Sequence, residues 1–229
     1  MMLHATRERN AHDIVGLAAT VVLAVCAVVI TAILAQREIR RTTVTARPIQ
    51  PQSDWLKYAD GGNGVGPRGS PVAVVAFFDY ECPACRLLED RLRKARTHIA
   101  GGFTVVYRHF PLAIHTHAEH AAIASECAAR QGRFESMHDA IFARGDSLGA
   151  VPWVRLAEQA GVQDTGAFNR CVGDSSAVLR LRRDLEAGAA LKVQRTPTIL
   201  VGGVRVTGVA PQSVLDSLIQ ASLALRRAP

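Results

Sequence analysis

The sequence predicts an α/β fold that contains an inserted helical block and is preceded by one N-terminal transmembrane helix. Three observations lead to this prediction. An uncharged apolar run extends from Ile14 to Ala35. A strand–helix–strand pattern follows over residues 72–110, and a strand–strand–helix pattern ends the chain after a mostly helical stretch. Strands and helices in this order indicate a sheet with helices packed against it.

The apolar run over residues 14–35 is long enough to cross a bilayer. At about 1.5 Å per residue it reaches roughly 33 Å. A cleavable signal peptide has a shorter apolar core and a small-x-small cleavage site, so we expect an uncleaved anchor, with a removed signal peptide as the alternative. Arginines flank both sides of the run and leave its orientation open. Cys26 lies inside the run, where packing is a simpler role than lipidation.

The segments around this run follow from composition. Residues 1–13 form an N-terminal flank, and residues 36–69, which are polar and rich in Pro, Gly and Arg, are expected to be a tether and loop. The globular part begins near residue 70. We expect it in three pieces, namely residues 70–114, the helical insertion 115–193 and residues 194–229.

Within the globular part, "VAVVAFF" (residues 72–78) is a continuous β-prone run, typical of a strand buried on both faces. The segment from Pro83 places leucines on one stripe and charges elsewhere, which predicts an amphipathic helix. "FTVVYRHF" (residues 103–110) predicts the second strand. Near the C-terminus, "TPTILVGGVRV" contains two β-prone runs around a Gly-Gly turn, and an amphipathic helix follows Pro211.

The sequence "FFDYECPACR" places Cys82 and Cys85 where the first strand meets the helix. Unpaired N–H groups at a helix N-terminus favour a thiolate, and Pro83 costs no hydrogen bond in the first turn. Cys82 is therefore expected to attack and Cys85, one turn along, to resolve. A zinc ribbon needs a second C-x-x-C, which the sequence lacks. A purely structural disulfide between Cys82 and Cys85 would close a very short loop and would therefore stabilise the fold little. Redox exchange is the favoured interpretation.

Four motifs together, "FFDYECPAC", "YRHFPL", "QGRFESMHDAIF" and "TPT", resemble the DsbA-type branch of the thioredoxin-fold disulfide oxidoreductases. The resemblance covers residues from Pro71 to the C-terminus. It implies a thioredoxin fold with an inserted helical domain. It also implies that Pro197 is cis and lies beside the dithiol, and that Thr196 offers backbone groups to a bound peptide, with Pro83 and Ala84 completing the substrate-binding site.

Two positions depart from the pattern of the strongly oxidising members. Ala84 replaces a histidine between the cysteines, and Ala76 replaces a buried acid six residues before the first cysteine. Losing the histidine removes a thiolate-stabilising donor, and Glu81 would raise the pKa of the neighbouring thiol slightly. The direction of electron flow is therefore less certain than the exchange itself.

The remaining cysteines and histidines are candidates for other sites. Cys127 and Cys171 are expected to form a disulfide in an oxidising compartment, with two buried free thiols as the alternative. "HTHAEH" (residues 115–120) is a better match to a polar helix start than to a metal site, so no metal and no cofactor is expected. Arg108 and His109, at a strand end, are expected to border the active-site groove.

These features favour a membrane-tethered thiol oxidase acting outside the cytoplasm. Its partners would be unfolded or partly folded proteins with free thiols, and a membrane redox protein that resets the dithiol. The net charge of +7 is spread thinly without interleaved aromatic residues, so nucleic-acid binding is not expected. A reductase or isomerase of the same fold, and a non-catalytic chaperone or scaffold, are the alternatives.

Overall fold

The computed structural model describes residues 21–32, 47–51, 54–67 and 69–227. The chain divides into two compact units, Met1–Val44 and Thr45–Pro229. In the first unit, residues 21–32 are helical and Cys26 is exposed. The flank 1–13 and the rest of the span predicted over residues 14–35 lie outside the described residues. Among the helices described, none combines the length and the apolar content needed to cross a membrane.

The second unit is built on a six-stranded mixed sheet with the strand order β1-β6-β5-β3-β4-β2. β3 pairs with β4 in parallel, and every other neighbouring pair is antiparallel. The predicted α/β class is thereby confirmed. The strands are β1 (Arg47–Pro51), β2 (Asn63–Val65), β3 (Val72–Phe78), β4 (Thr104–His109), β5 (Thr198–Val201) and β6 (Val204–Thr207).

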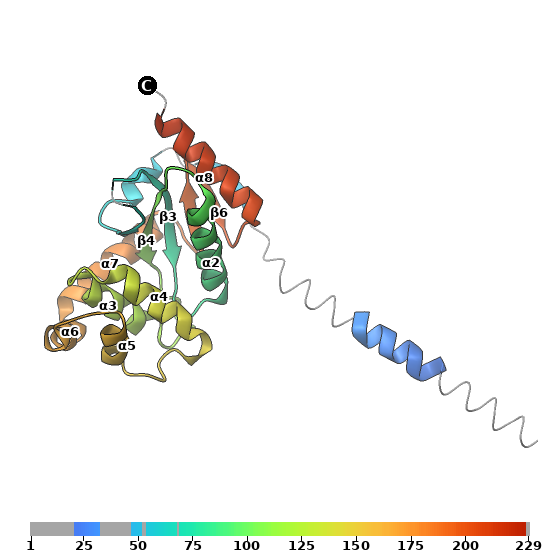
Figure 1. The fold of residues 1–229 in the computed structure, drawn as a ribbon, viewed down its shortest axis with the longest axis horizontal. Helices are drawn as coiled ribbons and strands as arrows, with labels where there is room; N and C mark the ends of the chain where they lie inside the picture. Colours follow the sequence, from blue (N-terminus) through green and yellow to red (C-terminus); the bar gives the residue numbers. More distant parts are fainter. Residues whose placement is uncertain (1–20, 33–46, 52–53, 68, 228–229) are drawn as a thin grey trace, which may run out of the picture. The chain divides into compact units, whose positions relative to one another are not determined.

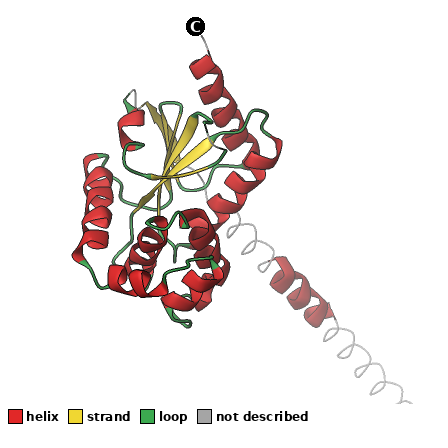
Figure 2. Cartoon of the chain, turned by 60° about the vertical axis from the view of Figure 1, so that its left-hand side comes forward, coloured by secondary structure: helices red, strands yellow, loops and turns green. Residues whose placement is uncertain are grey.

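β3 is buried on both faces, as its continuous apolar run predicted. Side chains alternate along a strand, so Val74, Ala76 and Phe78 belong to one core cluster, while Val75 and Phe77 belong to another. Helices α2 (Pro83–His98) and α8 (Gln212–Arg227) pack together on the first face (Figures 1 and 2). The short helix η1 (Trp55–Tyr58) contributes to the cluster on the second face.

The helical insertion lies between β4 and β5 in the sequence and is drawn yellow to orange in Figure 1. Its apolar side chains, including Met137, Phe142 and Phe168, belong to the same core cluster as Phe78 of the sheet. The insertion therefore shares one core with the sheet. Its helices are α3 (Ala118–Ala129), α4 (Phe134–Arg144), η2 (Gly145–Ser147), α5 (Trp153–Gln159), α6 (Thr165–Val172) and α7 (Ser175–Ala190).

Part of the stretch predicted to be a tether, residues 36–69, belongs instead to the globular unit. β1 pairs with β6, and β2 pairs with β4, at opposite edges of the sheet. Between them, Trp55 and Tyr58 are each only 6% exposed. Gly66 (φ +150°) shows why this glycine-rich stretch packs closely, since an added Cβ would lie 2.4 Å from the Phe103 carbonyl oxygen. Burial of two large aromatic side chains outweighs the loop-like composition.

Candidate dithiol active site

Cys82 lies between the end of β3 and the first turn of α2. It is the N-cap residue, with extended backbone angles (φ −73°, ψ 116°), and Pro83 follows it at the start of the helix. The Cys82 carbonyl oxygen accepts hydrogen bonds from the N–H groups of Cys85 and Arg86, at 3.0 and 3.2 Å. Proline fits here because the first turn needs no N–H donor. The Cys82 sulfur is therefore at the helix end that favours negative charge.

The Cys82 thiol is the more acidic of the two. A hydrogen bond with Cys85 is the largest influence on the pKa of Cys82, which is lowered to about 6 although burial opposes the charged form. The Thr196 side chain and the backbone N–H groups of Cys85 and Ala84 act in the same direction. The thiolate is the nucleophilic form of cysteine, so Cys82 is largely in its reactive form near neutral pH.

Cys85 has the opposite character. It is 2% exposed, and burial followed by the proximity of Cys82 raises the pKa of Cys85 well above its ordinary value. The backbone N–H of Asp79 lies 3.4 Å from its sulfur. One thiol is thus ionised while its neighbour stays protonated, as expected of an attacking and a resolving cysteine.

The residues predicted to bind substrate lie around this pair. The Thr196–Pro197 peptide bond is cis, as the DsbA-type resemblance implied. The Thr196 carbonyl oxygen accepts a hydrogen bond from the Cys82 thiol at 3.4 Å, so this segment lies directly beside the dithiol. Pro197 is buried, Ala84 is half-buried and Pro83 is exposed. These placements put the backbone of Thr196 next to the Cys82 sulfur.

Asp79 is a site residue that was not singled out from the sequence. Its carboxylate is buried and accepts hydrogen bonds from the Leu112 backbone N–H and from His115 Nδ1, both at 2.7 Å. Its backbone binds both cysteines, because its carbonyl oxygen also accepts from the Cys82 N–H at 3.2 Å. The one available signal is an acidic residue directly after a strand buried on both faces.

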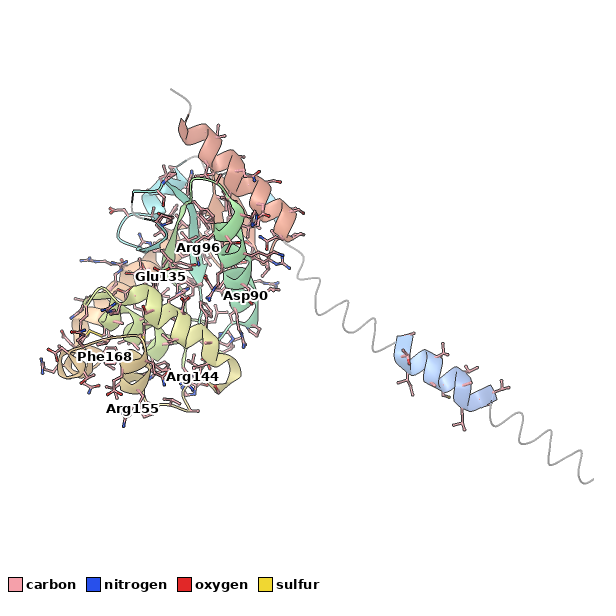
Figure 3. The ribbon with its side chains drawn as sticks, in the orientation of Figure 1. Asp90, Arg96, Glu135, Arg144, Arg155 and Phe168 are labelled. Carbon is pink, nitrogen blue, oxygen red and sulfur yellow. A yellow bond between two sulfur atoms is a disulfide. The ribbon has the colours of Figure 1, made fainter. Side chains whose placement is uncertain are left out.

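A buried carboxylate of α2 lies between β4 and the helical insertion. Glu89 of α2 binds Arg96, labelled in Figure 3, at 2.9 Å and accepts a hydrogen bond from the Tyr107 hydroxyl. His138 Nε2 of α4 lies 3.4 Å from the same carboxylate. Burial favours the neutral acid, but these three partners together lower the pKa of Glu89 to about 2. The helix that carries the dithiol is thereby connected to β4 through the Tyr107 hydroxyl and lies next to α4 at His138.

Three buried side chains, His109, Glu126 and Asp184, offer one ligand atom each within 4.8 Å of one another. They are already satisfied without an ion. Asp184 pairs with Arg108 at 2.6 Å and lies 3.8 Å from Arg180, and Glu126 accepts from His109 Nε2 at 2.9 Å. Two arginines balance two carboxylates, so a divalent cation would add unbalanced buried charge. The expectation that Arg108 and His109 border the groove is wrong, because both are buried in this network.

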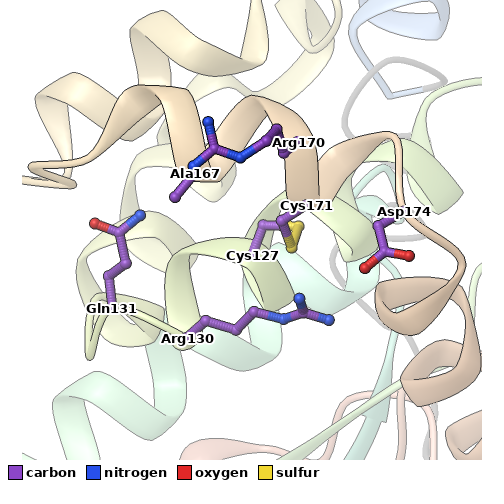
Figure 4. Close-up of a pocket in the computed structure, with 7 residues that line it drawn as sticks. All are labelled: Cys127, Arg130, Gln131, Ala167, Arg170, Cys171 and Asp174. Atoms are coloured by element: carbon purple, nitrogen blue, oxygen red, sulfur yellow. A yellow bond between two sulfur atoms is a disulfide. The ribbon is translucent and has the colours of Figure 1, made fainter.

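Cys127 of α3 and Cys171 of α6 form a disulfide with a Cα–Cα distance of 5.7 Å. Figure 4 shows this bond beside a surface pocket of about 460 Å³, which Arg130, Arg170 and Asp174 also line. The bond joins two helices of the insertion and leaves Cys82 and Cys85 as the free pair in the globular unit. It therefore does not compete with the dithiol for a partner.

Comparison with solved structures identifies the same fold in proteins from bacteria. A thioredoxin-like oxidoreductase from Silicibacter pomeroyi DSS-3 superposes with a TM-score of 0.62 and 24% identity, covering 78% of this chain and 99% of that one. The thiol-disulfide exchange protein alpha-DsbA2 from Wolbachia pipientis superposes with a TM-score of 0.63 and 17% identity, covering 72% and 91%. At these identities the likeness shows the fold.

Comparison with curated proteins and with family models gives a second result. A Na(+)/H(+) antiporter NhaA 3 from Salinispora tropica is 33% identical over 181 residues, which are 79% of this chain but 26% of that protein. The chain thus spans about a quarter of the length of the curated relatives it matches. A family model described as thioredoxin matches residues 60–221. Since this match covers more than half of the chain, the chain belongs to the thioredoxin family.

Proposed function

We propose that this protein is a membrane-anchored thiol:disulfide oxidase that acts outside the cytoplasm through the Cys82–Cys85 pair. The observation that carries the proposal is the unequal acidity of the two thiols. Cys82, at the N-terminus of α2, has its pKa lowered to about 6, and the pKa of the buried Cys85 is raised. A stabilised thiolate favours the reduced enzyme, which makes the disulfide a better oxidant.

The reaction follows from this asymmetry. A substrate thiolate attacks Cys82 Sγ of the disulfide, and Cys85 leaves as a thiolate and takes up a proton. A second substrate thiolate then attacks the substrate sulfur of the mixed disulfide and releases Cys82 as a thiolate. Two electrons pass to the enzyme, the substrate gains one disulfide, and a membrane redox partner must accept the two electrons to restore the Cys82–Cys85 bond.

We propose that the peptide around the substrate thiol binds along Thr196 and Pro197, with Pro83 and Ala84 forming the opposite wall. The Thr196 carbonyl oxygen, 3.4 Å from Cys82 Sγ, supports this assignment because it lies where a mixed disulfide would place the substrate backbone. Unfolded or partly folded proteins present such extended segments. No side-chain recognition beyond the thiol is required.

The proposed location depends on the sequence. The uncharged run over residues 14–35 supports a single N-terminal anchor in the cytoplasmic membrane, and the catalytic unit would then face the periplasm or the cell exterior. The disulfide between Cys127 and Cys171 is compatible with an oxidising compartment. An anchor would raise the concentration of the enzyme near a membrane partner.

The test is oxidation of a reduced, unfolded model protein that forms disulfides in its native state. The oxidised enzyme is expected to form them stoichiometrically, and Cys82→Ser to be inactive. Cys85→Ser is instead offered the disulfide-bonded form of the model protein; its Cys82 thiolate should attack that disulfide and accumulate as a mixed disulfide, because Cys85 is not there to resolve it. The double variant Cys127→Ser/Cys171→Ser is the matched control and should retain the activity. A mixed disulfide trapped through Cys85 would refute the assignment, and a reduction potential near −270 mV would indicate a reductase instead.

A further inference from the structure

The Asp79 carboxylate is fixed in one orientation beside the dithiol. The residue is 2% exposed, and its carboxylate oxygens accept hydrogen bonds from the Glu81 N–H at 2.8 Å, the Leu112 N–H at 2.7 Å and His115 Nδ1 at 2.7 Å. Two of these donors are backbone groups and cannot swing away. The third is a titratable ring whose position is therefore set by Asp79.

Asp79 also joins His115 to the two cysteines. Its backbone N–H lies 3.4 Å from Cys85 Sγ, and its carbonyl oxygen accepts the Cys82 N–H at 3.2 Å. The His115 side chain is 18% exposed, and within the described part of the chain its Nε2 has no hydrogen-bond partner. A single residue, Asp79, thus connects the His115 ring to the dithiol. The Nε2 atom of the ring makes no hydrogen bond within the described residues.

We propose that His115 is a positioning residue of the dithiol: held by Asp79, its imidazolium charge stabilises the Cys82 thiolate of the reduced enzyme and makes the disulfide a stronger oxidant. This inference rests on the proposed function. The two residues between the cysteines, Pro83 and Ala84, carry no charge. His115 supplies a cation from the loop before α3, on a different element of the fold.

The charges around the ring support this role. Partial burial favours neutral imidazole, but the hydrogen bond and charge of Asp79, followed by the charges of Cys82 and Glu81, raise the pKa of His115 above its ordinary value. All three are anionic when ionised, so the ring is the cation among them. Because the influence between two titrating groups is mutual, a charge on His115 favours the thiolate of Cys82 as much as the thiolate favours imidazolium.

The proton balance of the reaction gives the inference a measurable consequence. When a substrate dithiol reduces the Cys82–Cys85 bond, two electrons move to the enzyme and the two substrate thiols give up two protons. One proton goes to Cys85. The second proton does not bind to Cys82, which stays ionised. In those molecules whose His115 ring was neutral in the oxidised enzyme, His115 binds this proton.

The variants to compare are His115→Gln, which keeps a hydrogen-bond donor but removes the charge, and His115→Lys, which keeps a cation. His120→Gln is the matched control, because His120 is an exposed histidine of α3. In His115→Gln, the pKa of Cys82, followed by thiolate absorbance, is expected to rise by at least about half a unit. The equilibrium constant with glutathione should then shift at least about threefold toward the disulfide.

His115→Lys should keep the wild-type pKa of Cys82, and His120→Gln should change neither quantity. Equal values in His115→Gln and wild type, or equal shifts in the Gln and Lys variants, would overturn the inference. A second measurement needs no substitution: the NMR pKa of His115 should be higher in the reduced than in the oxidised wild type, and equal values would also overturn it. If wild type fails to exchange with glutathione, the proposed function fails, while the two titrations still test His115.

Discussion

Replacing Cys85 with alanine removes the hydrogen bond that contributes most to the acidity of Cys82. In the native protein the pKa of Cys82 falls from the ordinary value of 9.0 to about 6, so about nine-tenths of this thiol is ionised at pH 7 against about one-hundredth for an unperturbed one. A hydrogen bond to a charged group contributes about 1.5–3 kcal/mol, equivalent to about 1–2 pKa units. We therefore expect the pKa of Cys82 in Cys85→Ala to rise to about 7–8.

The assay is alkylation of the reduced protein with iodoacetamide between pH 4 and 10. Ionisation at pH 7 favours the native thiol about ninety-fold over an ordinary one, but lower basicity reduces its intrinsic nucleophilicity about fifteen- to thirty-fold. The native rate at pH 7 should thus exceed that of an ordinary cysteine by only about three- to six-fold. The stronger signature is the pH profile, whose midpoint should lie near 6 in wild type.

Thr196→Val provides a graded comparison, because it removes only one of the smaller influences on the thiol. Its midpoint should lie between those of wild type and Cys85→Ala. A wild-type midpoint close to 9, or an unchanged midpoint in Cys85→Ala, would refute the reasoning that hydrogen bonding within the dithiol ionises Cys82.

Three further predictions concern stability. Glu89→Gln should lower the free energy of urea unfolding by up to about 3 kcal/mol at neutral pH. Because the pKa of Glu89 in the folded protein is lowered to about 2, the difference between wild type and variant should shrink as the pH falls from about 4.5 toward 2. Asp184→Asn leaves the buried Arg108 guanidinium without its 2.6 Å ion pair and should cost about 3–5 kcal/mol, measured in the same way, whereas a loss below 1 kcal/mol would contradict it. Cys127→Ser/Cys171→Ser should lower stability by about 2–4 kcal/mol without changing the pKa of Cys82, and a changed thiol titration would show that the insertion tunes the dithiol.

The edge strands show where prediction from the sequence failed. β2 is only Asn63-Gly64-Val65, too short to show the alternation of a strand, and β1 begins and ends in proline-containing sequence. Their pairing with β4 and β6 depends on strands that lie far away in the chain. Amino-acid composition indicates only the local preference of this stretch, which is for a loop. Strand pairing with distant residues and the burial of Trp55 outweighed that preference.

The sequence by itself determined the parts that depend on local physics. A strand buried on both faces, a helix that begins at Pro83, and a cysteine at its N-cap are all encoded within the fifteen residues from Val72 to Arg86. The tertiary structure alone decided which distant groups surround those cysteines. Thr196 reaches Cys82 across 114 positions and His115 reaches Asp79 across 36, and no spacing in the sequence specifies such contacts. The acidity of a thiol is set by these neighbours, because hydrogen bonds and charges act through space and not along the chain.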